Sequence, residues 1–247
     1  MDRLGIIDWG IGGVSIYKLI KDQLGVPVTY FSDTGVTPYG KMTRAELVSR
    51  LDTVIEYLKL SGVTHLVIGC NAASTAIPFL KDHSITIEGV IESAIESTSK
   101  LKLERLGLIG GRRTVVSGVY RRGFGAKNIK VKQRIAQPLS ALIESGDVSS
   151  ETLKNECKKI LSPLKNCSHI LLACTHYPAI TEFMRPFISP VTQFIDPAAD
   201  LVKLVASWKL PTDGDDVFLT SGDANRMKKA AFVAFDVKLQ TVETLTI

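Results

Sequence analysis

Two cysteines, Cys70 and Cys174, stand at the ends of matching stretches of the sequence. In HLVIGCNAAS and HILLACTHYP, a histidine, four apolar or small residues and a cysteine follow one another in the same order. A thiol acts as a base only after it ionises, and a free cysteine has a pKa of about 8.5. A neighbouring acid or imidazole can relay that proton. His176 lies two residues after Cys174, and Asp8 ends a third apolar stretch, LGIID.

Short apolar runs that alternate with amphipathic stretches must position these side chains. One such stretch, residues 43–62, has the pattern of a long helix. The apolar runs have no polar face, which is typical of strands covered on both sides. This alternation predicts an α/β fold with mostly parallel sheets. The predicted strands are residues 4–9, 28–33, 65–70, 87–92, 105–111, 128–133, 169–174, 191–196 and 216–221.

An internal repeat divides the chain into two similar halves. LGIID at residues 4–8 is matched 102 residues later by LGLIG at residues 106–110, and the two cysteine stretches are 104 residues apart. Repetition at a nearly constant offset indicates a duplicated unit. We expect a first α/β domain of residues 1–95 plus about 208–247, where a last strand and helix return to it. Residues 96–207 would form the second domain.

The two cysteines are expected to face each other across one cleft. Ligands of open α/β sheets bind beyond the carboxyl ends of the strands, where both thiols and Asp8 lie. Asp8 would flank Cys70, and His176 would flank Cys174. Inversion of a stereocentre requires a proton to leave one face and another to arrive on the opposite face, which a thiolate and a thiol can do together. Main-chain N–H groups at the strand ends could stabilise the carbanion.

Composition narrows the class of protein. The 247 residues contain no apolar run of the roughly 18 residues that cross a bilayer, and the amino terminus lacks the form of a signal peptide. We expect a cytoplasmic protein that binds neither membrane nor nucleic acid, because the net charge of +5 is spread over helix faces. Without a Cys-x-x-Cys pair we expect no disulfides, and we interpret Cys157 and Cys167 as structural.

Five stretches together resemble the PLP-independent aspartate and glutamate racemases. They are IIDWGIGGVS, YFSDTGVTPYG, GCNAAS, PLSALIESGD and LLACTHYP, which span most of the chain in that order. The resemblance implies two flavodoxin-like domains, related by a pseudo-twofold axis, around a buried site. It also implies an isomerase that needs no cofactor and no metal, acts on a small acidic amino acid and forms a homodimer.

Carried over position by position, the resemblance makes Cys70 and Cys174 the two bases. Asp8 would assist Cys70, and His176 would assist Cys174. Glu144 in LIESGD matches a glutamate near the site of the family. The positions that would hold the substrate are Pro38, Tyr39, Gly40, Asn71 and Thr175.

The sequence departs from the glutamate racemase pattern at Trp9 and Ala72. The pattern has Asp-Ser-Gly where this chain has Asp8-Trp9-Gly10, and Cys-Asn-Thr where it has Cys70-Asn71-Ala72. Two hydroxyls that would face the substrate are therefore missing, and an indole has been added. We expect a shorter pocket that prefers aspartate, with glutamate as the alternative substrate.

Other interpretations of the same residues stay open. The facing thiols could form a redox disulfide, or bind zinc together with His176. The chain could also be a non-catalytic module that binds small acids, and GIGG could be a phosphate loop, although its spacing fits no known one. We interpret His65 and His169 as structural and Asp33 as a turn residue.

Overall fold

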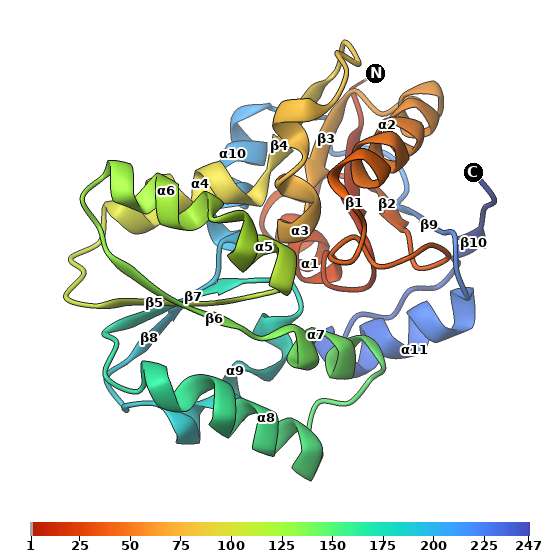
Figure 1. The fold of residues 1–247 in the computed structure, drawn as a ribbon. Helices are drawn as coiled ribbons and strands as arrows, with labels where there is room; N and C mark the ends of the chain where they lie inside the picture. Colours follow the sequence, from red (N-terminus) through yellow and green to blue (C-terminus); the bar gives the residue numbers. More distant parts are fainter. Residues whose placement is uncertain (1) are drawn as a thin grey trace.

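The computed structural model describes residues 2–247, which form two parallel β-sheets flanked by helices (Figure 1). The first sheet has the strand order β10-β9-β2-β1-β3-β4, and every neighbouring pair in it is parallel. Its strands are β1 (Leu4–Asp8), β2 (Val28–Ser32), β3 (His65–Ile68), β4 (Thr86–Gly89), β9 (Val217–Thr220) and β10 (Glu243–Thr244).

The second sheet repeats the central part of the first. Its order, β6-β5-β7-β8, corresponds strand for strand to β2-β1-β3-β4, and its pairs are also parallel. The strands are β5 (Leu106–Gly110), β6 (Val131–Ile135), β7 (His169–Ala173) and β8 (Gln193–Ile195). The predicted α/β fold with two similar parallel sheets is therefore confirmed.

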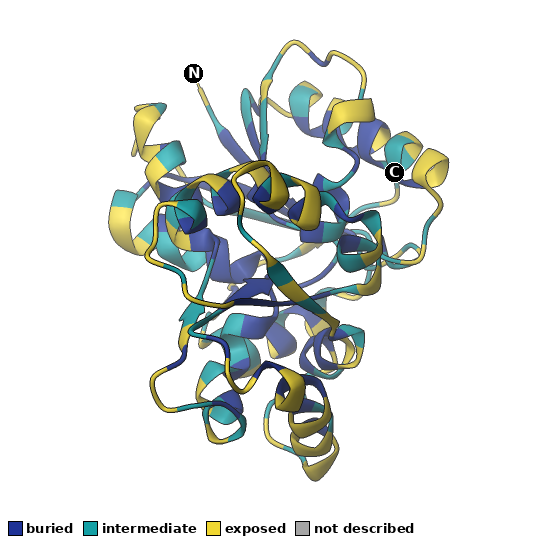
Figure 2. Cartoon of the chain, turned by 60° about the vertical axis from the view of Figure 1, so that its left-hand side comes forward, coloured by how far each residue is buried: buried dark blue, intermediate teal, exposed yellow. Residues whose placement is uncertain are grey.

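The central strands are buried on both faces, as their apolar sequences predict. All five residues of β1, β2 and β5 are buried, including Asp8 at the end of β1. In Figure 2 the central strands are dark blue, whereas the helices are yellow on their outer sides. Burial on two faces leaves only the strand ends and the loops beyond them open to a ligand.

The helices follow the amphipathic stretches. The longest, α2, begins with a capping box in which Thr43 and Glu46 satisfy each other's main-chain N–H groups. The α-helices are α1 (Val14–Leu24), α2 (Arg44–Leu60), α3 (Asn71–Ser74), α4 (Val90–Ser99), α5 (Arg112–Ser117), α6 (Val119–Ala126), α7 (Gln137–Glu144), α8 (Glu151–Leu161), α9 (Thr181–Met184), α10 (Ala198–Ser207) and α11 (Ala224–Phe235). Four 3₁₀ turns are Ile77–Phe79, Ser162–Leu164, Tyr177–Ile180 and Arg185–Phe187. Within the described residues, every helix is too short or too polar to span a bilayer.

Several details differ from the sequence prediction. Strand β6 was expected at residues 128–133 and lies at Val131–Ile135. The strand expected at residues 87–92 ends at Gly89, and α4 begins at Val90, whose apolar side chain is buried on a helix instead. The two-residue strand β10 was not predicted, because neither Glu243 nor Thr244 is buried. The carboxyl-terminal part does return to the first sheet, where β9 pairs with β2. The domain boundaries near residues 95 and 207 stay a prediction.

Candidate active site

One cavity of about 490 Å³ lies where the carboxyl ends of the two sheets meet. Its volume is in the range of sites for small molecules. Both cysteines line it, Cys70 after β3 and Cys174 after β7. The other site residues indicated by the sequence line it too: Asp8, Trp9, Pro38, Tyr39, Gly40, Asn71, Ala72, Glu144, Thr175 and His176.

Cys70 lies beside the carboxylate of Asp8. The residue precedes α3 with an extended backbone and is half-buried. Burial, together with the negative charge of Asp8, raises the pKa of the Cys70 thiol well above its ordinary value. Cys70 is therefore held as a neutral thiol, next to a group that can accept its proton.

Asp8 is itself almost completely buried, and its carboxylate joins the two halves of the chain. One oxygen accepts a hydrogen bond from the main-chain N–H of Trp9 at 2.6 Å, and the other accepts one from the hydroxyl of Thr175 at 2.7 Å. Burial raises the pKa of Asp8 despite these bonds and the nearby charge of His176. An acid with a raised pKa is a better proton acceptor at neutral pH than an ordinary aspartate.

Cys174 belongs to a second arrangement built from a histidine and a glutamate. His176 Nδ1 lies 3.6 Å from Cys174 Sγ, and His176 Nε2 lies 2.7 Å from Glu144 Oε2. Burial alone would lower the pKa of His176, but the hydrogen bonds and charges of Cys174 and Glu144 raise it well above its ordinary value. The imidazole thus lies between a carboxylate and a sulfur, and both neighbours favour its protonated form.

Glu144 also fixes the loop after β1. Its Oε2 accepts a hydrogen bond from the main-chain N–H of Ile11 at 2.9 Å. Two glycines make this approach possible, because a Cβ on Gly10 would lie 2.1 Å from Glu144 Oε2, and one on Gly12 would lie 2.6 Å from His176 Nδ1. The sequence GIGG therefore brings the loop close to the acid and the imidazole.

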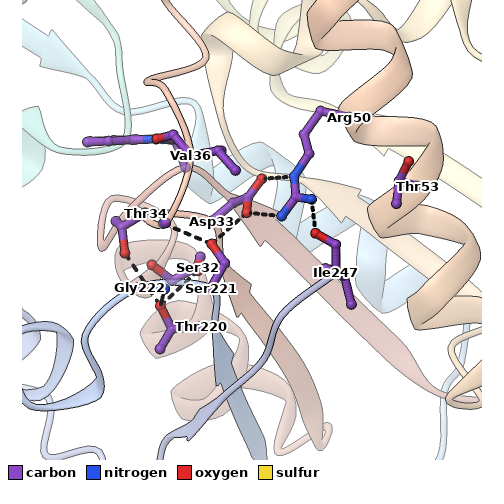
Figure 3. A network of polar contacts seen from close by, with 12 residues as sticks. Ser32, Asp33, Thr34, Val36, Arg50, Thr53, Thr220, Ser221, Gly222 and Ile247 are labelled. Atoms are coloured by element: carbon purple, nitrogen blue, oxygen red, sulfur yellow. Dashed lines mark hydrogen bonds and ion pairs between the residues drawn. The ribbon is translucent and has the colours of Figure 1, made fainter.

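A buried ion pair positions the loop that carries Tyr39. Arg50 of α2 donates two hydrogen bonds to the carboxylate of Asp33, at 2.6 and 2.8 Å, and also contacts the main-chain oxygen of Ile247 (Figure 3). The same carboxylate accepts hydrogen bonds from the hydroxyls of Tyr39 and Ser221, both at 2.7 Å. Asp33 was interpreted as a turn residue, but its buried carboxylate accepts four hydrogen bonds from Arg50, Tyr39 and Ser221. It therefore holds these three side chains together.

The side chains of Trp9 and Ala72 form part of the cavity wall. The indole N–H of Trp9 donates to the carbonyl of Val36 at 3.1 Å, and the half-buried ring packs against the apolar cluster of the first sheet. The side-chain oxygen of Asn71, which also lines the cavity, accepts a hydrogen bond from Tyr120 at 2.7 Å. The indole is thus anchored at the cavity wall by its own hydrogen bond.

Several cavity residues were not indicated by the sequence. Some lie within the stretches quoted above without having been singled out, namely Pro138, Ser140, Ala141 and Ala173. The others come from loops and helices that the fold brings near: Lys41, Gly111, Thr114, Gln137 and Arg226. Arg226 is the most distant in sequence and belongs to the returning helix α11. The one available signal was the expected return of this helix to the first sheet, which did not say which of its faces meets the cavity.

Comparison with known proteins shows which family the sequence and the fold of this chain match. Residues 4–205 match the family model described as Asp/Glu/Hydantoin racemase. A glutamate racemase of Desulforudis audaxviator is 30% identical over 208 residues, which are 81% of this chain and 76% of that protein. The crystal structure of a glutamate racemase of Francisella tularensis in complex with D-glutamate superposes with a TM-score of 0.89 at 25% identity, and covers 99% of this chain and 97% of its own.

The comparisons contradict the preference for aspartate that Trp9 and Ala72 suggested. The aspartate racemase structure of Picrophilus torridus is more distant, with a TM-score of 0.67 and 19% identity over 83% of this chain and 93% of its own. The prediction assumed that the indole of Trp9 would shorten the pocket. The indole is hydrogen-bonded to the carbonyl of Val36 and forms part of the wall of a cavity of about 490 Å³.

Proposed function

The chain belongs to the Asp/Glu/hydantoin racemase family, and we propose that it interconverts L-glutamate and D-glutamate through the two thiols of Cys70 and Cys174. It is a PLP-independent amino-acid racemase. One observation carries the two-base proposal. The two cysteines line a single cavity from different sheets, and each has its own proton-handling partner.

The groups beside the two thiols suggest how each takes part. His176 Nδ1 lies 3.6 Å from Cys174 Sγ and can take the proton of that thiol, whereas the half-buried Cys70 lies beside Asp8, and burial with the charge of Asp8 raises the pKa of its thiol. We therefore propose that Cys174 enters the reaction as the thiolate and Cys70 as the thiol.

In the proposed reaction the thiolate removes the α-proton of glutamate from one face. The C–H bond breaks, an S–H bond forms on Cys174, and the electron pair stays on the α-carbon and its carboxylate. The thiol of Cys70 then gives its proton to the opposite face, so that a new C–H bond forms and Cys70 becomes the thiolate. To restore the starting state, Cys174 gives its new proton to solvent by way of His176, and the Cys70 thiolate takes a proton from solvent by way of Asp8; the reverse reaction exchanges the roles.

Further groups support the proton transfers. Glu144 orients His176 through the bond at 2.7 Å and favours its protonated form, so it acts through the imidazole. Thr175 holds the carboxylate of Asp8, and Asn71 has its side-chain N–H₂ group left for a ligand once its oxygen is bonded to Tyr120. Pro38, Tyr39 and Gly40 form the wall that the Asp33–Arg50 pair fixes.

The substrate is tested by steady-state kinetics on L-glutamate and L-aspartate. We expect kcat/KM for glutamate to exceed that for aspartate by about 10-fold or more, because a site built to hold a longer acid loses contacts to the shorter one. Formation of the D-enantiomer is followed by chiral chromatography. Turnover of aspartate at an equal or greater kcat/KM would show that glutamate is not the proper substrate.

Two further features are proposed from the family resemblance alone. We propose that the protein works in the cytoplasm and that it forms a homodimer. Sedimentation equilibrium with and without L-glutamate measures the mass in solution, and a monomer under both conditions would contradict the second proposal.

A further inference from the structure

Most polar side chains around the cavity are already engaged with other protein groups. The indole N–H of Trp9 donates to a main-chain carbonyl, and the hydroxyl of Thr175 donates to Asp8. Ser140 and Gln137 bond to each other at 3.1 Å, and the hydroxyl of Ser140 also donates to the main chain. The side-chain N–H₂ group of Asn71 is left for one carboxylate of the ligand, so a second carboxylate needs a further donor.

The charges of the cavity also require a cation for such a ligand. Asp8 and Glu144 are buried acids in its wall, and glutamate adds two carboxylates and one ammonium. His176 is already paired with Glu144 at 2.7 Å. Of the described residues that line the cavity, the remaining cationic side chains are those of Lys41 and Arg226.

Arg226 lines the cavity, and its guanidinium is available to bind a ligand. It lies in the first turn of α11, where its main-chain N–H is bonded to Asp223. Helix α11 packs against α7 and against the 3₁₀ turn Tyr177–Ile180, beside the elements that carry Glu144 and His176 (Figure 1). Among residues 2–247, the exposed guanidinium of Arg226 has no hydrogen-bond or ion-pair partner.

We propose that Arg226 binds the side-chain carboxylate of the substrate, an inference that rests on glutamate racemisation as the proposed function. The α-carbon must lie between Cys70 and Cys174, so the far carboxylate is the one that can extend to the exposed rim where Arg226 lies. A guanidinium presents two parallel N–H groups to a carboxylate, which the ammonium of Lys41 cannot do. Arg226 then supplies donors in place of the hydroxyls that Trp9 and Ala72 lack.

Three variants test this assignment: R226Q, R226K and, as a matched control, K229Q. Lys229 is exposed on the same helix but does not line the cavity. We expect R226Q to raise KM for both glutamate enantiomers about 10-fold or more and to leave kcat within about 2-fold, since a charge-assisted contact present before and during the reaction is lost. R226K should recover part of the affinity, and K229Q should behave like the unmodified enzyme.

Inhibition by L-glutamine, which lacks the side-chain charge, shows which carboxylate is bound. R226Q should leave the inhibition constant for glutamine within about 2-fold of the original, while its KM for glutamate rises. Equal weakening of both ligands would overturn the assignment to the side-chain carboxylate, and an unchanged KM for glutamate would overturn any contact with Arg226. The proposed function fails separately, because in that case the unmodified enzyme itself does not racemise glutamate.

Discussion

Replacement of either Cys70 or Cys174 by alanine is expected to reduce glutamate racemisation by at least ~10³-fold, because each change removes the proton path on one face of the substrate. Both residues line the cavity and carry little of the core, so the variants should keep their fold. Chiral chromatography of the product and circular dichroism of the protein measure the two effects. Cys157→Ala and Cys167→Ala are controls, because these buried thiols lie outside the cavity, and they should racemise glutamate normally.

The single variants should also differ from each other in proton exchange. The cysteine that remains can still remove and return the α-proton on its own face, which exchanges hydrogen with solvent without inversion. Cys70→Ala and Cys174→Ala should therefore exchange opposite enantiomers of glutamate in heavy water, as nuclear magnetic resonance can show. If one of these variants still racemised glutamate fully, the cysteine that it lacks could not be one of the two bases.

Asp8→Asn is expected to lower kcat/KM by about 10²-fold or more, because the group that exchanges protons between Cys70 and solvent is lost. The fold should not be weakened by this change. The amide oxygen can accept the N–H of Trp9, and the amide N–H₂ group can donate to the Thr175 hydroxyl, which then acts as acceptor.

The pH dependence of stability follows from the raised pKa of Asp8. When the pKa of an acid is higher in the folded state than its unfolded value of about 3.9, stability falls as pH rises from about 4 through the folded-state pKa. Asp8→Asn removes this loss, so its melting temperature at pH 7 should equal or exceed that of the unmodified protein. Lower stability together with lost activity would instead identify Asp8 as structural.

Asp33→Asn is the matched control for Asp8→Asn. Asp33 is also a buried aspartate, but its carboxylate is held by Arg50, Tyr39 and Ser221. An asparagine there leaves the guanidinium of Arg50 without its charged partner, so the melting temperature should fall. Scanning calorimetry at pH 7 should therefore show a lower melting temperature for Asp33→Asn and an equal or higher one for Asp8→Asn.

The sequence predicts the sheets well because burial on both faces leaves a clear pattern. Strands β1, β2, β5 and β7 are nearly continuous apolar runs, and the repeat at offsets of 102 and 104 residues reflects the shared strand order of the two sheets. Strand β4 was extended too far, because Val90 and Ile91 are buried on a helix rather than in a sheet. Periodicity alone cannot separate these cases over so few residues.

The sequence predicted those site residues that lie at the ends of strands. It did not predict the parts of the cavity wall that depend on the direction of a side chain or on helix packing. Asp8, Cys70 and Cys174 follow from their places at or just beyond the ends of strands. The direction of the indole of Trp9 depends on the carbonyl of Val36, far along the chain, so the pocket argument for aspartate failed. Arg226 reaches the cavity only through the packing of α11, which no local pattern in the sequence specifies.

Early turnover of L-glutamate in heavy water tests the two-base account most directly. At low conversion, the D-glutamate formed by the unmodified enzyme should carry deuterium at the α-carbon, while the remaining L-glutamate should still carry protium there. This pattern arises because the proton leaves to one thiol and a solvent-derived deuteron arrives from the other. D-glutamate that retains the original α-proton would mean that a single base carries it between the faces, and would contradict the roles of Cys70 and Cys174.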